Sequence, residues 1–218
     1  MVVYNERKEI LDIVLLEKKK PSFEFEIMLQ GKDLWPVAGI DEVGRGALAG
    51  PVVVAAIILN PERIPRDIDD SKKLTSQKRE HLYEEIIKNS VVSIASLEHH
   101  YIDKHNIHKA TLDAIQHAVN GLNIFPKAVL IDGRSIPDNL PCQAFAIIKG
   151  DSYSLSIAAA SIVAKVTRDR IMKLAHNTYP EYGFNSHVGY PTKKHLQALK
   201  ENGPSKIHRM TFRPLRDY

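Results

Sequence analysis

Cysteine is nearly absent from this sequence, which holds a single one, Cys142, in 218 residues. One thiol cannot form a disulfide within the chain, and it cannot supply the several thiolates of a multi-cysteine metal site. Disulfide-stapled extracellular scaffolds are therefore excluded. The composition suits a reducing compartment, and we expect the protein to be cytoplasmic.

The sequence also lacks a long apolar run near its N-terminus. The apolar stretch from Ile10 to Leu16 is interrupted by Asp12 and followed by lysines. It is too short for a membrane span or for the core of a secretory signal. We predict instead an amphipathic helix over residues 5–19, followed by an irregular connection that reaches about Trp35.

A large excess of either charge is missing as well. The 30 lysines and arginines against 26 acidic residues give a net charge of +4 at pH 7. A polyanionic partner is compatible with this balance but is not required by it. The P-loop pattern Gly-x-x-x-x-Gly-Lys-Ser/Thr is absent, so nucleotide hydrolysis of that kind is unsupported.

What the sequence does contain is an alternation of apolar β-branched runs with segments of helical period, which is typical of an α/β fold. With 44% hydrophobic residues, the chain is expected to form one main body and at most a small lobe. Strands are predicted over residues 37–41, 52–59, 91–97, 128–131 and 143–148. Helices are predicted over residues 76–88, 101–119, 154–175 and from the Thr192 cap to about Glu201.

Acidic residues stand at the ends of three predicted strands. Asp41 and Glu42 close the first strand, Asp132 closes another, and Asp151 follows the last. Strands of one open α/β sheet gather their ends in a shared crevice, so four carboxylates are expected to converge. Converging carboxylates need a cation, and oxygen ligands favour Mg²⁺ or Mn²⁺. Two ions about 4 Å apart would suit phosphodiester hydrolysis.

Each of these acids, taken singly, is also explained as the cap of a helix or turn. A geometric objection concerns Asp41 and Glu42, because neighbours on a regular strand point to opposite faces. Both can face one ion only if the strand bends or ends there, which Gly44 makes plausible.

Three further segments have both a functional and a structural explanation. The sequence Gly44-Arg45-Gly46 is either a simple turn or a backbone that a sugar and its phosphate approach closely. Ser71 and Lys72 suit phosphate contact, although a capped helix start explains them nearly as well. Tyr190, in a glycine-bounded loop, is either a stacking platform for a sugar or base or an ordinary packing residue.

Two groups of residues are interpreted as mainly solvated. One is a set of histidines that lie close in sequence but lack the arrangement of a zinc site: His99, His100, His105 and His108. The other is a set of basic residues that could line a duplex groove: Lys165, Arg168, Arg170, Lys193 and Lys194.

The stretch from Gly39 to Gly46, continued by Leu48 to Pro51, resembles the opening signature of the type 2 ribonuclease H (ribonuclease HII) family. Other stretches resemble the family in the same order, and together they cover about Trp35 to Phe212: residues 70–74, 131–133, 149–151, 156–169, 179–184, 189–192 and 208–209.

This resemblance implies an α/β fold with a ribonuclease H-like mixed β-sheet flanked by helices. The catalytic domain would span residues 35–218 and include a small C-terminal helical lobe at about 179–218. Residues 1–34 would form an N-terminal helical extension and linker outside the family core. The related type 3 enzymes differ by a larger N-terminal domain and by a Glu at the fourth acidic position, which is Asp151 here.

The resemblance also assigns roles to residues. The metal-binding catalytic acids would be Asp41, Glu42, Asp132 and Asp151, with Asp169 as a further candidate near the metals. The substrate-binding residues would be Gly44, Arg45, Gly46, Ser71, Lys72 and Tyr190. The glycine-rich backbone would contact a ribose 2′-hydroxyl and Tyr190 would stack on the next deoxyribose, so that the pair reads an RNA-to-DNA junction.

The implied enzyme is a monomeric endoribonuclease that depends on Mg²⁺ or Mn²⁺. It would hydrolyse the RNA strand of RNA/DNA hybrids and incise 5′ of single ribonucleotides in duplex DNA, leaving 5′-phosphate and 3′-hydroxyl ends. That activity would serve ribonucleotide removal in replication and repair. Two alternatives remain open at this point: a non-catalytic duplex-binding module with structural acids, and another enzyme with clustered acids, such as a phosphatase or a DNA strand-transfer enzyme.

Overall fold

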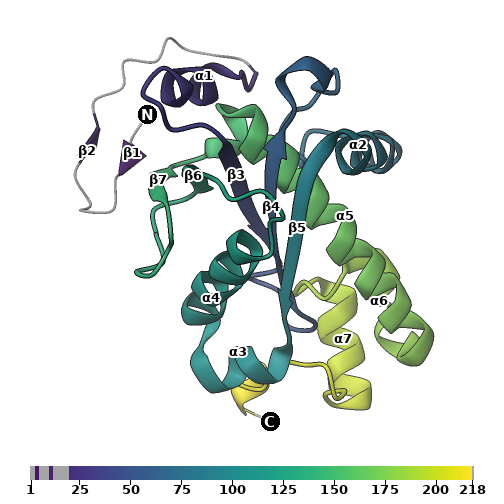
Figure 1. The fold of residues 1–218 in the computed structure, drawn as a ribbon. Helices are drawn as coiled ribbons and strands as arrows, with labels where there is room; N and C mark the ends of the chain where they lie inside the picture. The colour runs from purple at the N-terminus through teal and green to yellow at the C-terminus, as the bar shows by residue number, and fades with distance from the viewer. Residues whose placement is uncertain (1–2, 5–9, 12–19, 218) are drawn as a thin grey trace.

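A computed structural model describes residues 3–4, 10–11 and 20–217 of the chain, and its central element is a mixed sheet in the order β2-β1-β7-β6-β3-β4-β5 (Figure 1). β6 runs parallel to both β3 and β7, whereas β4 pairs antiparallel with β3 and β5. The strands are β1 Val3–Tyr4, β2 Ile10–Leu11, β3 Val37–Val43, β4 Val52–Leu59, β5 Ser90–Leu97, β6 Ala128–Asp132 and β7 Gln143–Ile147. The predicted α/β fold with a mixed sheet is confirmed.

Helices cover both faces of this sheet (Figure 1). On one face, α2 and α5 pack against β4 through a cluster that includes Ile57, Ile86 and Ile162. On the other face, α4 packs against β3 and β4 through Ile40, Ile115 and their neighbours. The helices are α1 Glu24–Gln30, α2 Ser76–Asn89, α3 His99–His105, α4 Ile107–Asn120, α5 Leu155–Thr178, α6 Phe184–His187 and α7 Lys193–Asn202, with short 3-10 helices η1 Pro61–Arg63, η2 Gly150–Ser152, η3 Pro180–Tyr182 and η4 Leu215–Asp217.

The prediction for the N-terminal segment was largely wrong where it can be compared. Most of the predicted helix 5–19 lies outside the described residues, but Ile10–Leu11 form β2, which pairs with β1 at the edge of the sheet. Open backbone groups at a sheet edge favour a further strand whatever the local helical pattern. The predicted irregular connection contains α1, whose Phe25 and Leu29, one helical turn apart, are buried.

A buried carboxylate joins α1 to the start of α5. Glu26 Oε1 accepts hydrogen bonds from Ser154 Oγ at 2.6 Å and from the Ser156 backbone N–H at 3.0 Å. Ser154 is also the N-cap of α5, where its hydroxyl accepts from the Ile157 N–H. Burial raises the pKa of Glu26, because the apolar surroundings disfavour its charged form. The segment before β3 is thus packed against the main body.

The predicted helix 101–119 is two helices. α3 ends at His105 and α4 begins at Ile107, because Asn106 adopts a left-handed φ of 66°. The Asn106 side chain then caps α4 by accepting from the Lys109 N–H. The predicted cap of the last helix is confirmed, since the Thr192 hydroxyl accepts from the His195 N–H at the start of α7.

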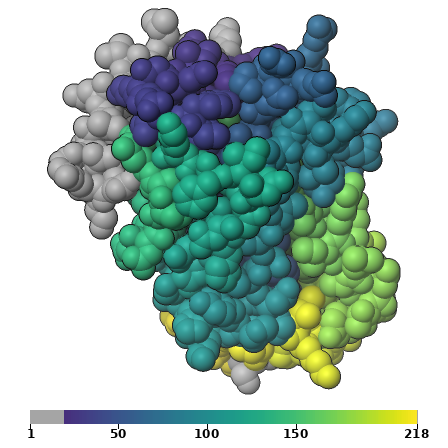
Figure 2. Space-filling view, in the orientation of Figure 1, coloured from purple at the N-terminus to yellow at the C-terminus, as the bar shows by residue number. Residues whose placement is uncertain are grey.

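The C-terminal lobe packs on the loop between β3 and β4. Leu48 and Ala49 of that loop share a buried cluster with Phe184, Leu199 and other lobe residues. The chain then turns under α3, where Asp103 accepts hydrogen bonds from the backbone of residues 210 and 211. Figure 2 shows this yellow C-terminal segment below the teal helices. In the described part of the chain, no helix is long and apolar enough to cross a membrane.

Candidate active site

Two acids lie side by side at the carboxyl ends of parallel strands. Ile40 of β3 pairs with Ile131 of β6, so Asp41 and Asp132, the next residue of each strand, occupy neighbouring positions on one face. Asp151 follows β7 in the short helix η2. The Gly150 N–H donates to Asp132 Oδ1 at 2.7 Å, which fixes the turn that carries Asp151 beside Asp132.

The strand that carries the first acid does not end there, contrary to the prediction. β3 continues to Val43, because Glu42 pairs with Val54 and Val43 with Val53 of β4. Burial raises the pKa of the Asp41 carboxyl, and a hydrogen bond from Ser161 of α5 offsets only part of that rise. The Glu42 carboxylate instead accepts from Arg45 Nη1 at 3.1 Å. The strand therefore stays paired through Glu42, and the pocket beside it is lined by both Asp41 and Glu42.

The acids raise one another's pKa. The pKa of Asp41 is well above its usual value because the group is buried and because Glu42, Asp132 and Asp151 repel its charge. Burial and the charge of Asp151 raise the pKa of Asp132 to about 6. Burial, followed by repulsion from Asp70, raises the pKa of Asp151. The side chains thus share one electrostatic site whose negative charge is only partly compensated.

Lys72 supplies a cation beside the aspartates of this site. Its ammonium lies 3.6 Å from Asp151 Oδ2, while its side chain is 80% exposed. Partial desolvation lowers the pKa of Lys72, but attraction to carboxylates, chiefly Asp151, outweighs it and the net pKa is raised. Ser71 is placed differently, since its hydroxyl is buried and hydrogen-bonds Ser161 Oγ at 2.8 Å. Its predicted contact with substrate stays a prediction.

A pocket of about 240 Å³ opens beside the acids. It is lined by residues from β3, the Ser71 segment, α5 and the tyrosine loop: Asp41, Glu42, Val43, Ser71, Lys72, Ser161, Lys165 and Tyr190. Lys165 Nζ also forms an ion pair of 2.7 Å with Asp169, one turn further along α5. Asp169 is therefore linked to the pocket by its ion pair with Lys165, which is a lining residue. Its role near a metal stays a prediction.

The fit of this site to a divalent ion rests on its donors. Among the residues that the structure describes, no three acidic, histidine or cysteine side chains are already arranged around a point that an ion could occupy. The available donors are carboxylate oxygens, which suit Mg²⁺ and Mn²⁺, and their raised pKa values reflect a repulsion that a cation would relieve. The side chains present fit such ions, and both Asp41 and Glu42 line the pocket.

The glycine-rich loop faces the tyrosine loop. A β-carbon at Gly46 would lie 4.0 Å from Tyr190 Cε1, so the two segments border the same space. The Leu48 N–H donates to the Gly189 carbonyl at 2.8 Å and holds the loops together. Gly44 has a φ of 95°, and a β-carbon there would collide with the Arg168 side chain. The segments predicted to read the sugars are thus adjacent in the fold.

Two buried arginines that the sequence did not single out for this role hold these loops. Arg168, predicted as a candidate for a duplex groove, is 0% exposed and donates to the carbonyls of Ala49, Pro51 and Val188. That prediction was wrong, because the side chain points into the protein. Arg209 is also 0% exposed and donates to the carbonyls of Arg45 and Gly50.

One of these arginines contacts the ring of Tyr190. Arg168 Cζ lies 5.3 Å from the centroid of that ring, within cation–π range. Burial lowers the pKa of Arg209 to about 9, with repulsion from Arg168 as the next cause. Both arginines lie next to catalytic motifs in the sequence, and that position could have indicated their role. Their carbonyl partners could not be predicted from the sequence.

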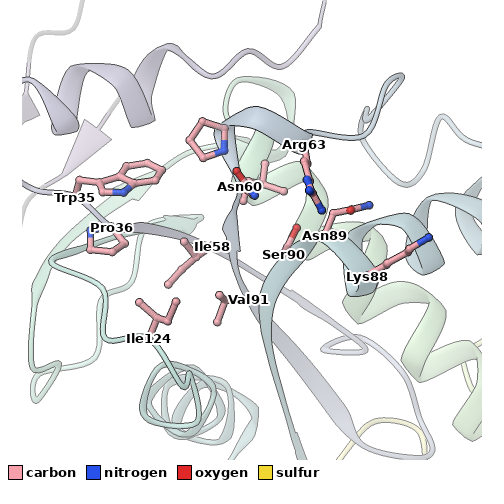
Figure 3. Close-up of a pocket in the computed structure, with 12 residues that line it drawn as sticks. Trp35, Pro36, Ile58, Asn60, Arg63, Lys88, Asn89, Ser90, Val91 and Ile124 are labelled. Carbon is pink, nitrogen blue, oxygen red and sulfur yellow. The ribbon is translucent and has the colours of Figure 1, made fainter.

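A larger pocket lies at the other end of the central strands. Its volume is about 380 Å³, and Trp35, Pro36, Ile58 and Ile124 form its apolar walls, with Lys88 at its rim (Figure 3). It adjoins the start of β3 and the end of β4, whereas the acids lie toward the other end of β3. Size alone would point to this pocket, but its lining includes none of the predicted catalytic acids.

The histidines near α3 form no metal site. His99 and His100 make an edge-to-face ring contact with each other, and His105 packs on Tyr101. They do not belong to any ligand cluster in the described residues.

A family model and curated relatives of this chain point to the same family. The model of the family described as Ribonuclease HII matches residues 38–214. Ribonuclease HII of Agrobacterium fabrum is 57% identical over 196 residues, which cover 90% of this chain and 90% of that protein. Ribonuclease HII of Sinorhizobium medicae is likewise 57% identical over 196 residues, covering 90% of this chain and 91% of its own.

Solved structures agree with the sequence comparison. The crystal structure of ribonuclease H2 from Pyrococcus horikoshii aligns with a TM-score of 0.71 at 28% identity, covering 83% of this chain and 95% of the other. The RNase HII in a complex with PCNA from Archaeoglobus fulgidus aligns with a TM-score of 0.68 at 27% identity, covering 84% and 99%. With a ribonuclease H-like fold and these relatives, the chain belongs to the ribonuclease HII family of endoribonucleases.

Proposed function

We propose that this endoribonuclease cuts the ribonucleotide-containing strand of a duplex with DNA, both in continuous hybrids and on the 5′ side of single embedded ribonucleotides. The observation that carries the proposal is that Asp41, Glu42 and Tyr190 line one pocket. Acids able to hold metal ions and a ring able to stack on a sugar thus border the same space. The products would carry 5′-phosphate and 3′-hydroxyl ends.

The proposed cofactor is a pair of divalent ions, Mg²⁺ or Mn²⁺. Asp41, Asp132 and Asp151 would hold them together with Glu42, and Asp169 is a further candidate. When bound, such ions activate a water molecule and stabilise the leaving oxygen of a phosphodiester. Support comes from the carboxylates themselves, because burial and then mutual repulsion raise the pKa of Asp41 and Asp132.

The proposed selectivity resides in the two facing loops. The backbone of residues 44–46 would contact the 2′-hydroxyl of the ribonucleotide, and Tyr190 would stack on the deoxyribose that follows. Lys72, exposed beside Asp151, would contact a phosphate, with Ser71 behind it. A 2′-hydroxyl distinguishes RNA from DNA. Contact with the 2′-hydroxyl of one sugar, together with stacking on a deoxyribose next to it, would therefore define an RNA-to-DNA junction.

The function is tested with duplex DNA that contains one ribonucleotide, incubated with Mg²⁺ or Mn²⁺ beside an all-DNA duplex. We expect a single cut on the 5′ side of the ribonucleotide and none in the control. Binding of the duplex without any cut would favour the non-catalytic binding module. Equal cutting of both duplexes would favour a DNA-directed enzyme.

Removal of the tyrosine ring tests the selectivity. We predict that Tyr190→Ala lowers kcat/KM at a single embedded ribonucleotide by about 10-fold, the loss of one stacking contact, and affects a continuous hybrid less. A continuous hybrid has no deoxyribose at the next position, so it draws less on this contact. Both substrates are followed in single-turnover cleavage. Equal losses would rule out the reading of a junction.

An added methyl group at Gly46 tests the opposite wall. Gly46→Ala places a β-carbon at ordinary contact distance, 4.0 Å, from Tyr190 Cε1, so the fold should be unaffected. The methyl group would displace a bound sugar, and we predict a fall in kcat/KM of about 10- to 100-fold. Gly31→Ala, at the end of α1 with its nearest contact at 3.5 Å, is the matched control. Comparable activity of the two variants would contradict the assignment.

The cellular setting is part of the same proposal. A monomeric cytoplasmic enzyme that recognises embedded ribonucleotides would remove them during DNA replication and repair. Size-exclusion chromatography with light scattering would test the monomeric state, with a mass near 24.6 kDa expected.

A further inference from the structure

Three histidine rings form a buried group in the C-terminal lobe. His187, His195 and His208 are 7%, 0% and 1% exposed. The rings of His187 and His195 stack with centroids 4.5 Å apart, and His195 Nε2 lies 3.0 Å from His208 Nε2. Tyr182 and Phe184 pack around His208. Neither the proposed metal site nor the substrate contacts use these rings.

The hydrogen bonds of the His208 and His195 rings can have only one direction. The Ser205 backbone N–H, which can only donate, lies 2.9 Å from His208 Nδ1, so this nitrogen accepts. A neutral His208 then carries its proton on Nε2 and donates it to His195 Nε2. The remaining proton of His195 is on Nδ1, which lies 3.0 Å from the carbonyl oxygen of Tyr190.

Both rings are held in the neutral form by their surroundings. Burial lowers the pKa of His208 to about 4, with repulsion from His195, His99 and His187 in addition. Burial also lowers the pKa of His195, and His187 repels its charge. A charged His195 would carry protons on both nitrogens and would lose the hydrogen bond from His208. A charged His208 would place a proton on Nδ1, where the Ser205 N–H already points, and would lose that contact instead.

The relay ends at the backbone of the residue proposed to read the sugar. The Tyr190 carbonyl also accepts from the Thr192 N–H at 2.8 Å, and the Tyr190 N–H donates to the His187 carbonyl at 2.9 Å. His187 itself accepts from the Gly189 N–H through Nδ1. The peptide groups on both sides of Tyr190 are thereby fixed, which sets the direction in which its ring leaves the backbone.

We propose that His195 and His208 are positioning residues for Tyr190, acting as a neutral, one-way hydrogen-bond relay that runs from Ser205 through His208 and His195 to the Tyr190 carbonyl. The relay itself follows from the contacts above. Its effect on substrate choice rests on the proposed function, because only there does Tyr190 test the sugar.

The ring tautomers test the relay without any measurement of activity. Long-range ¹H–¹⁵N spectra of the wild-type protein distinguish protonated from unprotonated ring nitrogens. We expect His208 to be protonated on Nε2 and His195 on Nδ1, with both rings neutral from pH 6 to 8. A His208 protonated on Nδ1, or a charged His195 in this range, would overturn the proposal.

Substitution of His208 tests the effect on Tyr190. The amide nitrogen of His208→Gln can stand where Nε2 stands and donate to His195, whereas His208→Leu cannot donate. We expect His208→Leu to lower cleavage at a single ribonucleotide about fivefold more than cleavage of a continuous hybrid, the effect of one hydrogen bond, and His208→Gln to restore most of that ratio. A ratio that is unchanged in His208→Leu, with both rates reduced together, would show a merely structural role and overturn the proposal.

The junction-reading function of Tyr190 and the positioning role of His195 and His208 can be refuted separately. If Tyr190→Ala leaves the substrate ratio unchanged, the junction-reading function is wrong, and the ring spectra alone decide the relay. If Tyr190→Ala changes the ratio but His208→Leu does not, the function stands and the positioning role is wrong.

Discussion

Asp132→Asn is expected to abolish cleavage, with a loss in kcat of at least about 1000-fold, while hybrid binding stays within about tenfold of wild type. Asparagine keeps the shape of the side chain and can still accept the hydrogen bond from the Gly150 N–H. It removes one negative charge from the proposed ion site, whose contribution to catalysis lies in stabilising charge on the reacting phosphate. Single-turnover cleavage and fluorescence anisotropy of a labelled hybrid measure the two properties.

The same variant should be more stable than wild type when metal is absent. The folded-state pKa of Asp132 is about 6, above its ordinary value of 3.8. A raised carboxyl pKa means that stability is present at low pH and is lost as pH rises through 6, because the ionised form is disfavoured in the fold. The neutral amide avoids this loss, so the variant should gain up to about 3 kcal/mol above pH 6 and nothing below pH 4.

Added Mg²⁺ should reverse this order of stability and make the wild type more stable than Asp132→Asn. An ion that binds the folded wild type raises its Tm, whereas the variant should show little response. Asp138→Asn, at an exposed aspartate, is the control and should behave like wild type in every assay. Wild-type cleavage rates in Asp132→Asn, or an equal rise in its Tm with Mg²⁺, would refute the metal assignment.

Arg209→Lys should be the most destabilising conservative change in the loop region. The guanidinium donates from three nitrogens to the carbonyls of Arg45 and Gly50, and a single ammonium cannot reproduce that planar arrangement. At least one buried carbonyl would lose its partner, so we predict a loss of about 3 kcal/mol in the free energy of unfolding. Urea unfolding monitored by circular dichroism measures it.

Arg63→Lys provides the comparison, because that arginine is exposed. It should change the free energy of unfolding by less than about 0.5 kcal/mol. If Arg209→Lys were equally mild, the buried guanidinium would have no part in holding the loops. If Arg209→Lys is destabilised but cleaves a continuous hybrid and a single ribonucleotide with the wild-type ratio, the arginine supports the fold without tuning selectivity.

Much of the sheet could be predicted because its strands are continuous apolar runs. The predicted strand 52–59 matches β4 at both ends, since the strand is buried along its whole length and bounded by Pro51 and Asn60. The break at Asn106 was missed because helical periodicity continues across it on both sides. A left-handed residue between two helices leaves no mark on the spacing of apolar residues.

The acids of the site were predicted from their positions at strand ends, but their mutual placement was not. The register that puts Asp41 beside Asp132 depends on the parallel pairing of β3 with β6, residues that are distant in sequence. The buried arginines and histidines were harder still, because most of their partners are backbone groups, which carry no residue identity. A sequence can indicate which side chain needs a partner but not which peptide group supplies it.

The pairing of the β3–β4 loop with the C-terminal segment has a consequence for protein synthesis. The Gly50 N–H donates to the Ile207 carbonyl, and the Arg209 N–H donates to the Leu48 carbonyl. A nascent chain can assemble the sheet and its acids while residues 207–209 are still inside the ribosome. The loop that would select the substrate gains these partners only when residues 207–209 have emerged, so it is completed later in synthesis than the sheet.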